Sequence, residues 1–226
     1  MRRRQTFMTR VYVVVEGQTE ESFVNEVLAP ALTPRRIYLY PILLGGKGGN
    51  VNYARVQKDV LRQLKQDPSA YCTTMLDFYG LGKDFPGTPV PPNLSNLAKA
   101  THIEEAVSGD IIAQALGLRP DVRFIPHLQL HEFEGLLFSD PAAFASGINQ
   151  SNLAGQFQSI REGFPTPEDI DDGPTSAPSK RVLRLCASYR KVLNGIQAAK
   201  TVGVDAMRRE CPHFREWFER LEQLGA

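Results

Sequence analysis

One short stretch decides the fold expected for this chain: residues 13–21 read VVVEGQTEE. The β-branched valine run suits a strand that is covered on both faces. Gly17 supplies a sharp turn, and Thr19 can cap a helix whose first turn then contains two glutamates. This order places the carboxylate of Glu16 at the carboxyl edge of a sheet, where open α/β folds hold their ligands.

Glu20 and Glu21, the two glutamates of that helical turn, have two interpretations. The helix macrodipole favours negative charge in a first turn, so both can be ordinary helix-start residues. Alternatively, one of them joins Glu16 at the sheet edge. Glu16 itself precedes the helix, so the macrodipole does not explain its position.

The rest of the first 130 residues alternates between strand-like and helical patterns. The first helix is expected to stop at Pro30, because proline lacks the amide that a helix interior needs. Further strands are predicted at 37–44 and 71–77, and helices at 56–64 and 103–115, from the spacing of their apolar residues. This alternation is typical of an α/β protein with a parallel sheet of about four strands flanked by helices.

A fourth strand is predicted at 122–130, where apolar residues alternate with polar ones. Pro126 within it favours a position near the sheet edge. Residues 78–96 are rich in glycine and proline, and they follow Asp77 directly. We therefore interpret this segment as a long irregular loop and a candidate lid.

The remaining residues, 141–226, are predicted to be a mainly helical elaboration of a core at 10–140, within a single domain that spans 1–226. Asp140 precedes a proline and marks a helix start. The segment 163–178 is predicted to be a solvated acidic linker. Long helices are then expected at 182–196 and near the C-terminus, where the aromatic residues at helical spacing should be core contacts. The acids of the linker are Glu168, Asp169, Asp171 and Asp172.

Composition limits the functional classes. The net charge of +1 gives no bulk attraction to nucleic acid or membrane, so polyanion binding would need a local patch. No apolar stretch approaches the roughly 20 residues that span a bilayer, so we expect no membrane insertion. The three cysteines are far apart and lack metal-ligand spacing, which fits a reducing cytoplasm. Residues 1–7 are either a basic arm or an extension upstream of a start at Met8.

Acidic residues follow three of the predicted strands: Glu16, Asp77, and the pair Glu132 and Glu134. Carboxylates gathered at one sheet edge need a counter-charge, and Mg²⁺ or Mn²⁺ supplies it through oxygen ligands. Metal ions in such sites can clamp the oxygens of a phosphodiester. If the fourth strand continued to residue 134, Glu132 and Glu134 would share a face, whereas a helix beginning there would separate them. A polar strand end without metal is the alternative.

Other polar groups also have two interpretations. The glycine loop at 45–49 could hold a phosphate through its amides, or it could be a flexible connection. Lys180 follows a Pro-Ser turn and is a candidate catalytic residue that neutralises phosphate, or else a solvated helix-start residue. His131 is either a base or a hydrogen-bonded strand end.

Two motifs carry a family resemblance: VEGQTE at 15–20 and MLDFYG at 75–80 resemble the Toprim fold of OLD-type nucleases and related bacterial proteins. The resemblance implies a small Rossmann-type sheet that binds Mg²⁺ for phosphodiester chemistry. Glu16 matches the first glutamate of the family, Glu20 the second OLD-type acid, and Asp77 the first aspartate of an Asp-x-Asp pair. Tyr79 stands where the second aspartate is expected, which puts the usual metal site in doubt unless Glu132 or Glu134 compensates.

A further resemblance covers the whole chain. The segments LHEFEGLLF at 130–138, PSKR at 178–181 and CPHF at 211–214 are similar to a bacterial family of unknown function with a Toprim-like core. That resemblance implies a fold but no activity. The Toprim-like motifs, taken with the acids after the strands, lead us to expect a Mg²⁺-dependent nuclease of bacterial defence or DNA metabolism, with Glu16, Glu20, Asp77, Glu132 and Glu134 around the metal. Such a protein would act on DNA or RNA, with or without a separate ATPase partner. A non-catalytic module that binds nucleic acid or protein is the alternative.

Overall fold

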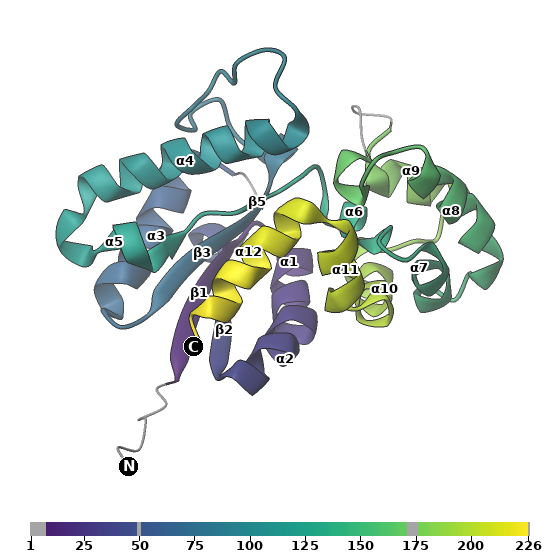
Figure 1. Ribbon diagram of the computed structural model, residues 1–226, viewed down its shortest axis with the longest axis horizontal. Coiled ribbons are helices and arrows are strands. Elements are labelled where there is room, and N and C mark those ends of the chain that lie inside the picture. The colour runs from purple at the N-terminus through teal and green to yellow at the C-terminus, as the bar shows by residue number, and fades with distance from the viewer. Residues whose placement is uncertain (1–7, 49–50, 171–175, 226) are drawn as a thin grey trace.

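The computed structural model describes residues 8–48, 51–170 and 176–225 (Figure 1). Its centre is a parallel sheet in the order β2-β1-β3-β4, with β5 also paired to β3. This confirms the predicted α/β fold class with a parallel sheet and a helical C-terminal region. The strands are β1 (Thr9–Val15), β2 (Ile37–Leu43), β3 (Tyr71–Asp77), β4 (Phe124–Ile125) and β5 (Leu128–Gln129).

Helices cover the sheet and continue beyond it. The α-helices are α1 (Gln18–Phe23), α2 (Ala29–Leu32), α3 (Tyr53–Gln66), α4 (Asn96–Gln114), α5 (Pro120–Arg123), α6 (Phe133–Leu137), α7 (Pro141–Gly147), α8 (Ala154–Glu162), α9 (Pro178–Leu185), α10 (Ile196–Val202), α11 (Val204–Glu210) and α12 (Pro212–Gln223). Two π-helical segments, η1 (Val24–Leu28) and η8 (Lys191–Gly195), join α1 to α2 and lead into α10. No helix in the described ranges combines the length and apolar character that a bilayer crossing requires.

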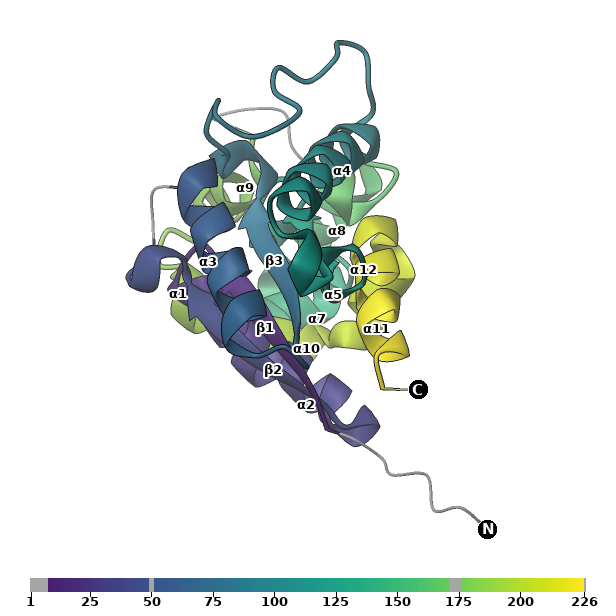
Figure 2. The ribbon, with the colours of Figure 1, turned by 90° about the vertical axis from the view of Figure 1, so that its left-hand side faces the viewer.

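The two faces of the sheet are buried in different ways. On one face α3 and α4 pack against Val14, Cys72 and Leu76 (Figure 2). On the other face a larger core joins the remaining strand side chains to α1, α2 and α12, and it extends without interruption into α6–α11. The central strands β1 and β3 are therefore covered on both faces, whereas the edge strand β2 is partly open, with Tyr40 40% exposed.

Three predicted boundaries are wrong. Pro30 does not end the first helix, because it lies in the first turn of α2, where proline is tolerated, directly after η1. The predicted strand 122–130 is broken into α5, β4 and β5, and Val122 is 52% exposed. The predicted helix 182–196 is interrupted between α9 and η8.

The predicted helix start at Asp140 is confirmed, because its side chain accepts a hydrogen bond from the Ala143 amide. The prediction of a solvated linker is wrong for Glu168, which is buried and accepts hydrogen bonds from the first amides of α12. Asp171 and Asp172 lie outside the described residues, as do residues 1–7. The aromatic side chains of α12, Phe214, Trp217 and Phe218, are core residues as predicted.

Candidate functional site

The register of the sheet brings Glu16 and Asp77 to the same edge. Val15 pairs with Met75 in parallel strands, so Glu16 follows the end of β1 beside the end of β3, where Asp77 lies. The backbone of Asp77 lies close enough to the Glu16 carboxylate to favour its charged form, which opposes part of the rise in the pKa of Glu16 that burial causes. The two acids thus occupy the carboxyl edge at which a parallel α/β sheet presents its ligand groups.

Two glycines allow loops to approach Glu16 closely. A Cβ atom on Gly80 would lie 3.2 Å from Glu16 Oε2, and one on Gly48 would lie 2.8 Å from the Glu16 carbonyl oxygen. Gly48 also has a φ of +74°, which side chains disfavour. The backbone around the carboxylate is therefore packed too tightly for larger residues.

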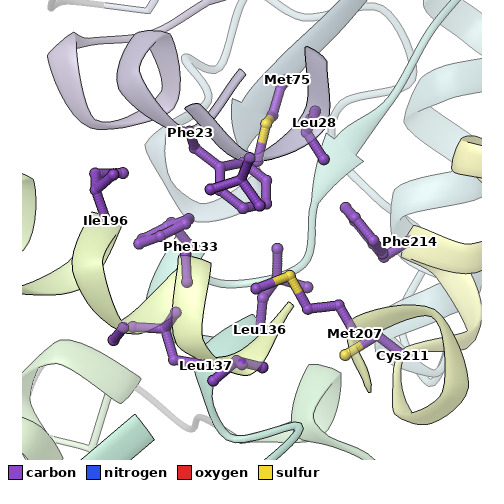
Figure 3. Packing of buried hydrophobic residues seen from close by; sticks show 14 of the residues in the cluster. Phe23, Leu28, Met75, Phe133, Leu136, Leu137, Ile196, Met207, Cys211 and Phe214 are labelled. Atoms are coloured by element: carbon purple, nitrogen blue, oxygen red, sulfur yellow. The ribbon is translucent and has the colours of Figure 1, made fainter. Parts of the chain in front are cut away.

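Two helices contribute the next acids, and the hydrophobic core fixes their relative position. Glu20 lies in the first turn of α1, and Glu134 lies in the first turn of α6. The Phe23 ring of α1 meets the Phe133 ring of α6 edge-on, with centroids 5.0 Å apart (Figure 3). Because α6 begins at Phe133 after Glu132, the helical alternative in the sequence analysis applies, and Glu132 and Glu134 point to different partners.

Lys191 of η8 joins these carboxylates. Its Nζ lies 3.3 Å from Glu134 Oε2, and 3.7 Å from both Glu20 Oε1 and Asp77 Oδ2. Gly195 at the end of η8 lets this segment pack against Tyr189 and Phe133, because a Cβ atom there would lie 2.7 Å from the Tyr189 hydroxyl and 3.2 Å from the Phe133 ring. We call Glu16, Glu20, Asp77, Glu134 and Lys191 the carboxylate edge.

Burial dominates the electrostatics of the carboxylate edge. It raises the pKa of Glu134, whose side chain is 0% exposed, to about 7, despite the opposing charge of Lys191. Burial also raises the pKa of Asp77 well above its usual range, and that of Glu16, to which the charge of Glu20 adds. The pKa of Lys191 is raised because the charges of Glu134, Asp77 and Glu20 outweigh its own burial. One ammonium group thus faces several carboxyl groups that are costly to ionise.

Some buried oxygens of the carboxylate edge lack partners. Within the described part of the chain, Glu16 Oε2, Asp77 Oδ1 and Glu134 Oε2 have no hydrogen bond, although Glu134 Oε2 faces the Lys191 ammonium. Buried oxygens of this kind cost free energy unless a donor or a cation satisfies them. The donor set, all carboxylate oxygen, is the type that Mg²⁺ and Mn²⁺ accept.

The other predicted site residues have different surroundings. Glu132 accepts hydrogen bonds from the amide and the hydroxyl of Ser179, at 2.9 and 3.1 Å, and so caps the start of α9. Lys180, in the same turn, is exposed. Tyr79 is 58% exposed and stacks on the ring of His131, with centroids 5.0 Å apart. In the glycine loop, the amide of Gly45 is bound by Asp59.

The sequence analysis missed Lys191, because an irregular turn before η8 hides its place in the fold. A second group of polar residues was also not predicted from the sequence. It is formed by Glu104, His127 and His213, and one donor atom from each residue lies within 4.8 Å of the others. These three residues could hold a metal ion. Among the described residues no other set of three histidine, cysteine or acidic side chains meets this spacing, so the acids of the carboxylate edge are more widely spread. Only the CPHF motif pointed toward His213.

Comparison with known proteins gives a family without an assigned activity. The model of a domain of unknown function, DUF4276, matches residues 15–222. Searches among curated proteins and among solved structures found no match. The matched range includes every residue of the carboxylate edge and of the Glu104, His127 and His213 group. The chain therefore belongs to the DUF4276 family.

Proposed function

We propose that the protein is a Mg²⁺- or Mn²⁺-dependent phosphodiesterase, acting as a nuclease on DNA or RNA. The observation that carries this proposal is the pair of unpartnered, buried carboxylate oxygens, Glu16 Oε2 and Asp77 Oδ1, at the carboxyl edge of a parallel sheet, with the buried carboxyl group of Glu134 close by. The Toprim-like motifs at 15–20 and 75–80 support the same chemistry and include two of these residues.

The residues present fit a hard divalent cation in donor type, since all are carboxylate oxygens, and their wider spacing means that they would close around the ion on binding. Glu16, Asp77 and Glu134 would hold it, and Glu20 would support them from α1. Glu132 is less suited, because both its oxygens already accept hydrogen bonds from Ser179. When bound, Mg²⁺ supplies positive charge that stabilises the oxygens of a reacting phosphodiester.

The chain's own cation has a role in this proposal. Lys191 is 34% exposed, so its ammonium can reach solvent as well as the buried acids. Without metal it neutralises part of the acidic charge. With a nucleic acid bound, it can neutralise a non-bridging phosphate oxygen. Lys191 therefore replaces Lys180 as the proposed catalytic lysine. Lys180 lies exposed on α9. The acid nearest to it in that turn, Glu132, already accepts hydrogen bonds from Ser179.

A non-catalytic module that binds nucleic acid or a protein, such as a separate ATPase, is the second candidate. The observation that favours it is the self-compensated state of the carboxylate edge: Lys191 already contacts three of the acids, and Tyr79 stands where a further carboxylate is expected. A binding module can lose its cation and keep its function.

Substitution of Glu16 tests the proposal. We expect isothermal titration to show Mn²⁺ and Mg²⁺ binding by the wild-type protein, and Glu16→Gln to weaken it and abolish metal-dependent cleavage of DNA or RNA. Glu162→Gln is the matched control, because it removes one charge from an exposed side chain of α8. Equal metal binding by wild type and Glu16→Gln would remove Glu16 from the site. Metal binding without cleavage of any nucleic acid would favour the binding module.

A further inference from the structure

A second cluster, separate from the carboxylate edge, brings together three parts of the chain. Glu104 comes from α4, His127 from the link between β4 and β5, and His213 from the first turn of α12. His213 Nε2 lies 2.9 Å from Glu104 Oε1, and His127 Nδ1 lies 3.8 Å from the same oxygen. We call these residues the histidine cluster.

His127 is the unusual member of the histidine cluster. Its side chain is 1% exposed, and its ring stacks on Trp217 with centroids 4.3 Å apart and planes within 7°. Within the described residues neither ring nitrogen has a hydrogen-bond partner. The 3.8 Å separation from Glu104 is too long for a hydrogen bond. Stacking on Trp217 therefore fixes the imidazole of His127, and one of its ring nitrogens keeps an unused lone pair close to Glu104 and His213. Such a nitrogen can bind a cation.

The other two members are already oriented by hydrogen bonds. The Leu128 amide donates to Glu104 Oε1 at 2.6 Å, which fixes that carboxylate against β5. The His213 backbone amide donates to buried Glu168 at 2.9 Å, which fixes the start of α12. Such outer contacts are typical of sites that hold metal ligands in position.

The donor set decides the class of metal. Two imidazoles and one carboxylate suit Zn²⁺ and its first-row neighbours, whereas Mg²⁺ prefers oxygen alone. Tetrahedral ligands at about 2.0–2.2 Å from zinc lie roughly 3.3 Å apart. The widest separation between the present donor atoms, up to 4.8 Å, must contract by about an ångström or more, whereas the 2.9 Å between His213 Nε2 and Glu104 Oε1 must open slightly.

A pocket of about 270 Å³ opens directly onto the histidine cluster and is lined by all three of its members. Ser108 and Arg220 also line it. A metal with three protein ligands keeps a fourth position, and here that position would face the pocket. We propose that the histidine cluster binds a divalent transition metal of the Zn²⁺ class, which ties α12 and α4 to the sheet and presents an open coordination position to the pocket.

Titration of metal-free protein tests this proposal. The protein should carry no histidine tag, because a tag would bind Zn²⁺ itself and the chain has only four histidines of its own. We expect one equivalent of Zn²⁺ to bind and to raise the melting temperature. Co²⁺ should give a visible absorption band that Zn²⁺ displaces, a readout that needs no variant. His127→Gln should weaken Zn²⁺ binding by more than the roughly 10–100-fold that outer-shell changes cost. His213→Gln, which can keep a hydrogen bond to Glu104, should do the same.

Two control variants separate the histidine cluster from the rest of the protein. His102→Gln changes a half-buried histidine of α4 that bonds the Gly87 carbonyl, and it should leave Zn²⁺ binding unchanged. Asp77→Asn alters the carboxylate edge and should also leave it unchanged. Absence of Zn²⁺ binding and of the Co²⁺ band in the wild type would overturn the proposal, as would equal affinities of wild type and His127→Gln. Either result would leave the proposed nuclease site untouched.

Discussion

The carboxylate edge and the histidine cluster use buried polar groups in opposite ways. The carboxylate edge contains its own cation, because Lys191 contacts three of its acids. In the histidine cluster the imidazole of His127 has no hydrogen-bond partner among the described residues, and a stacked tryptophan holds it in place. In the first arrangement Lys191 offsets part of the acidic charge without metal, although Glu16 Oε2 and Asp77 Oδ1 keep no partner among the described residues. In the second, the buried imidazole of His127 stays unsatisfied until a ligand arrives. The difference predicts that the two regions respond to different perturbations.

Removing the internal cation should produce the largest effect. Lys191→Met leaves buried carboxyl groups without compensation, and removing one partner of a buried ion pair costs about 3–5 kcal/mol. Because the ammonium is 34% exposed, we expect roughly 3 kcal/mol of lost stability in chelator. Urea unfolding would measure it. Added Mg²⁺ should restore much of the loss and bind more tightly than to the wild type.

Lys200→Met is the matched control for that comparison. Lys200 pairs with Glu26 at the surface, with both side chains more than 40% exposed. A surface ion pair contributes about 0–1 kcal/mol, so this variant should change little and should not respond to Mg²⁺. Equal losses in the two lysine variants would mean that the carboxylate edge does not depend on its internal cation.

Glu134 should give the carboxylate edge a pH dependence that a single substitution can isolate. Its pKa is about 7 in the folded protein against 4.5 for an ordinary glutamate, so the folded state binds the proton more tightly. The stabilisation is complete below about pH 4.5 and is lost as the pH rises through about 7. At 1.36 kcal/mol per pKa unit, a difference of about 2.5 units amounts to roughly 3 kcal/mol of lost stability.

Glu134→Gln should remove this contribution, because glutamine does not ionise. The measurement is urea unfolding in chelator from pH 4.5 to pH 8, with wild type and variant compared at each pH. The wild type should lose stability relative to the variant as the pH rises. A constant difference across the range would show that Glu134 does not titrate in this window.

The two regions also differ in how far the sequence reveals them. Glu16 and Asp77 could be predicted because each ends a continuous apolar strand, and parallel strands end at the same edge. The histidine cluster could not be predicted, because Glu104, His127 and His213 are far apart in the sequence and only the tertiary fold brings them together. His127 is placed by the break between β4 and β5, where the sequence pattern indicated one continuous strand.

The errors in the predicted elements share a physical cause. Proline was taken as a terminator at Pro30 and as an edge-strand residue at Pro126. In the structure Pro30 lies in the first turn of α2. Strand β4 lies at the sheet edge as predicted, but Pro126 interrupts the chain between β4 and β5 instead of continuing the strand. Lys180 was selected because it follows a Pro-Ser turn, whereas Lys191 reaches the acids through the π-helical segment η8. Tertiary packing decides these positions, so periodicity does not find them.

Glu168 caps the helix that carries His213, so its substitution tests the histidine cluster separately from the carboxylate edge. Its carboxylate accepts hydrogen bonds from the amides of His213 and Phe214, at 2.9 and 2.8 Å. Glu168→Gln keeps one acceptor oxygen and places a donor against the other amide, which should cost about 1–2 kcal/mol. Because α12 carries His213, Zn²⁺ affinity should also fall, while Mg²⁺ binding should not. An unchanged free energy of unfolding would show that the cap is dispensable.

Tyr79 should give the smallest effect and tests the carboxylate edge alone. It stands where the Toprim-like pattern has an aspartate, and its ring is 58% exposed against His131. Tyr79→Asp should tighten Mn²⁺ binding by roughly 3–10-fold, about 1 kcal/mol, because it adds a carboxylate beside Asp77 in a partly solvated position. Tyr79→Asn is the control, since it removes the same ring without adding charge. Isothermal titration of both variants shows whether the added charge or the removal of the ring tightens Mn²⁺ binding.

If Tyr79→Asn tightens binding as much as Tyr79→Asp, the tyrosine ring only blocks access to the site. If neither does, this position is not part of the metal site. Zn²⁺ binding at the histidine cluster should be the same in both variants, because no ligand of that cluster has changed.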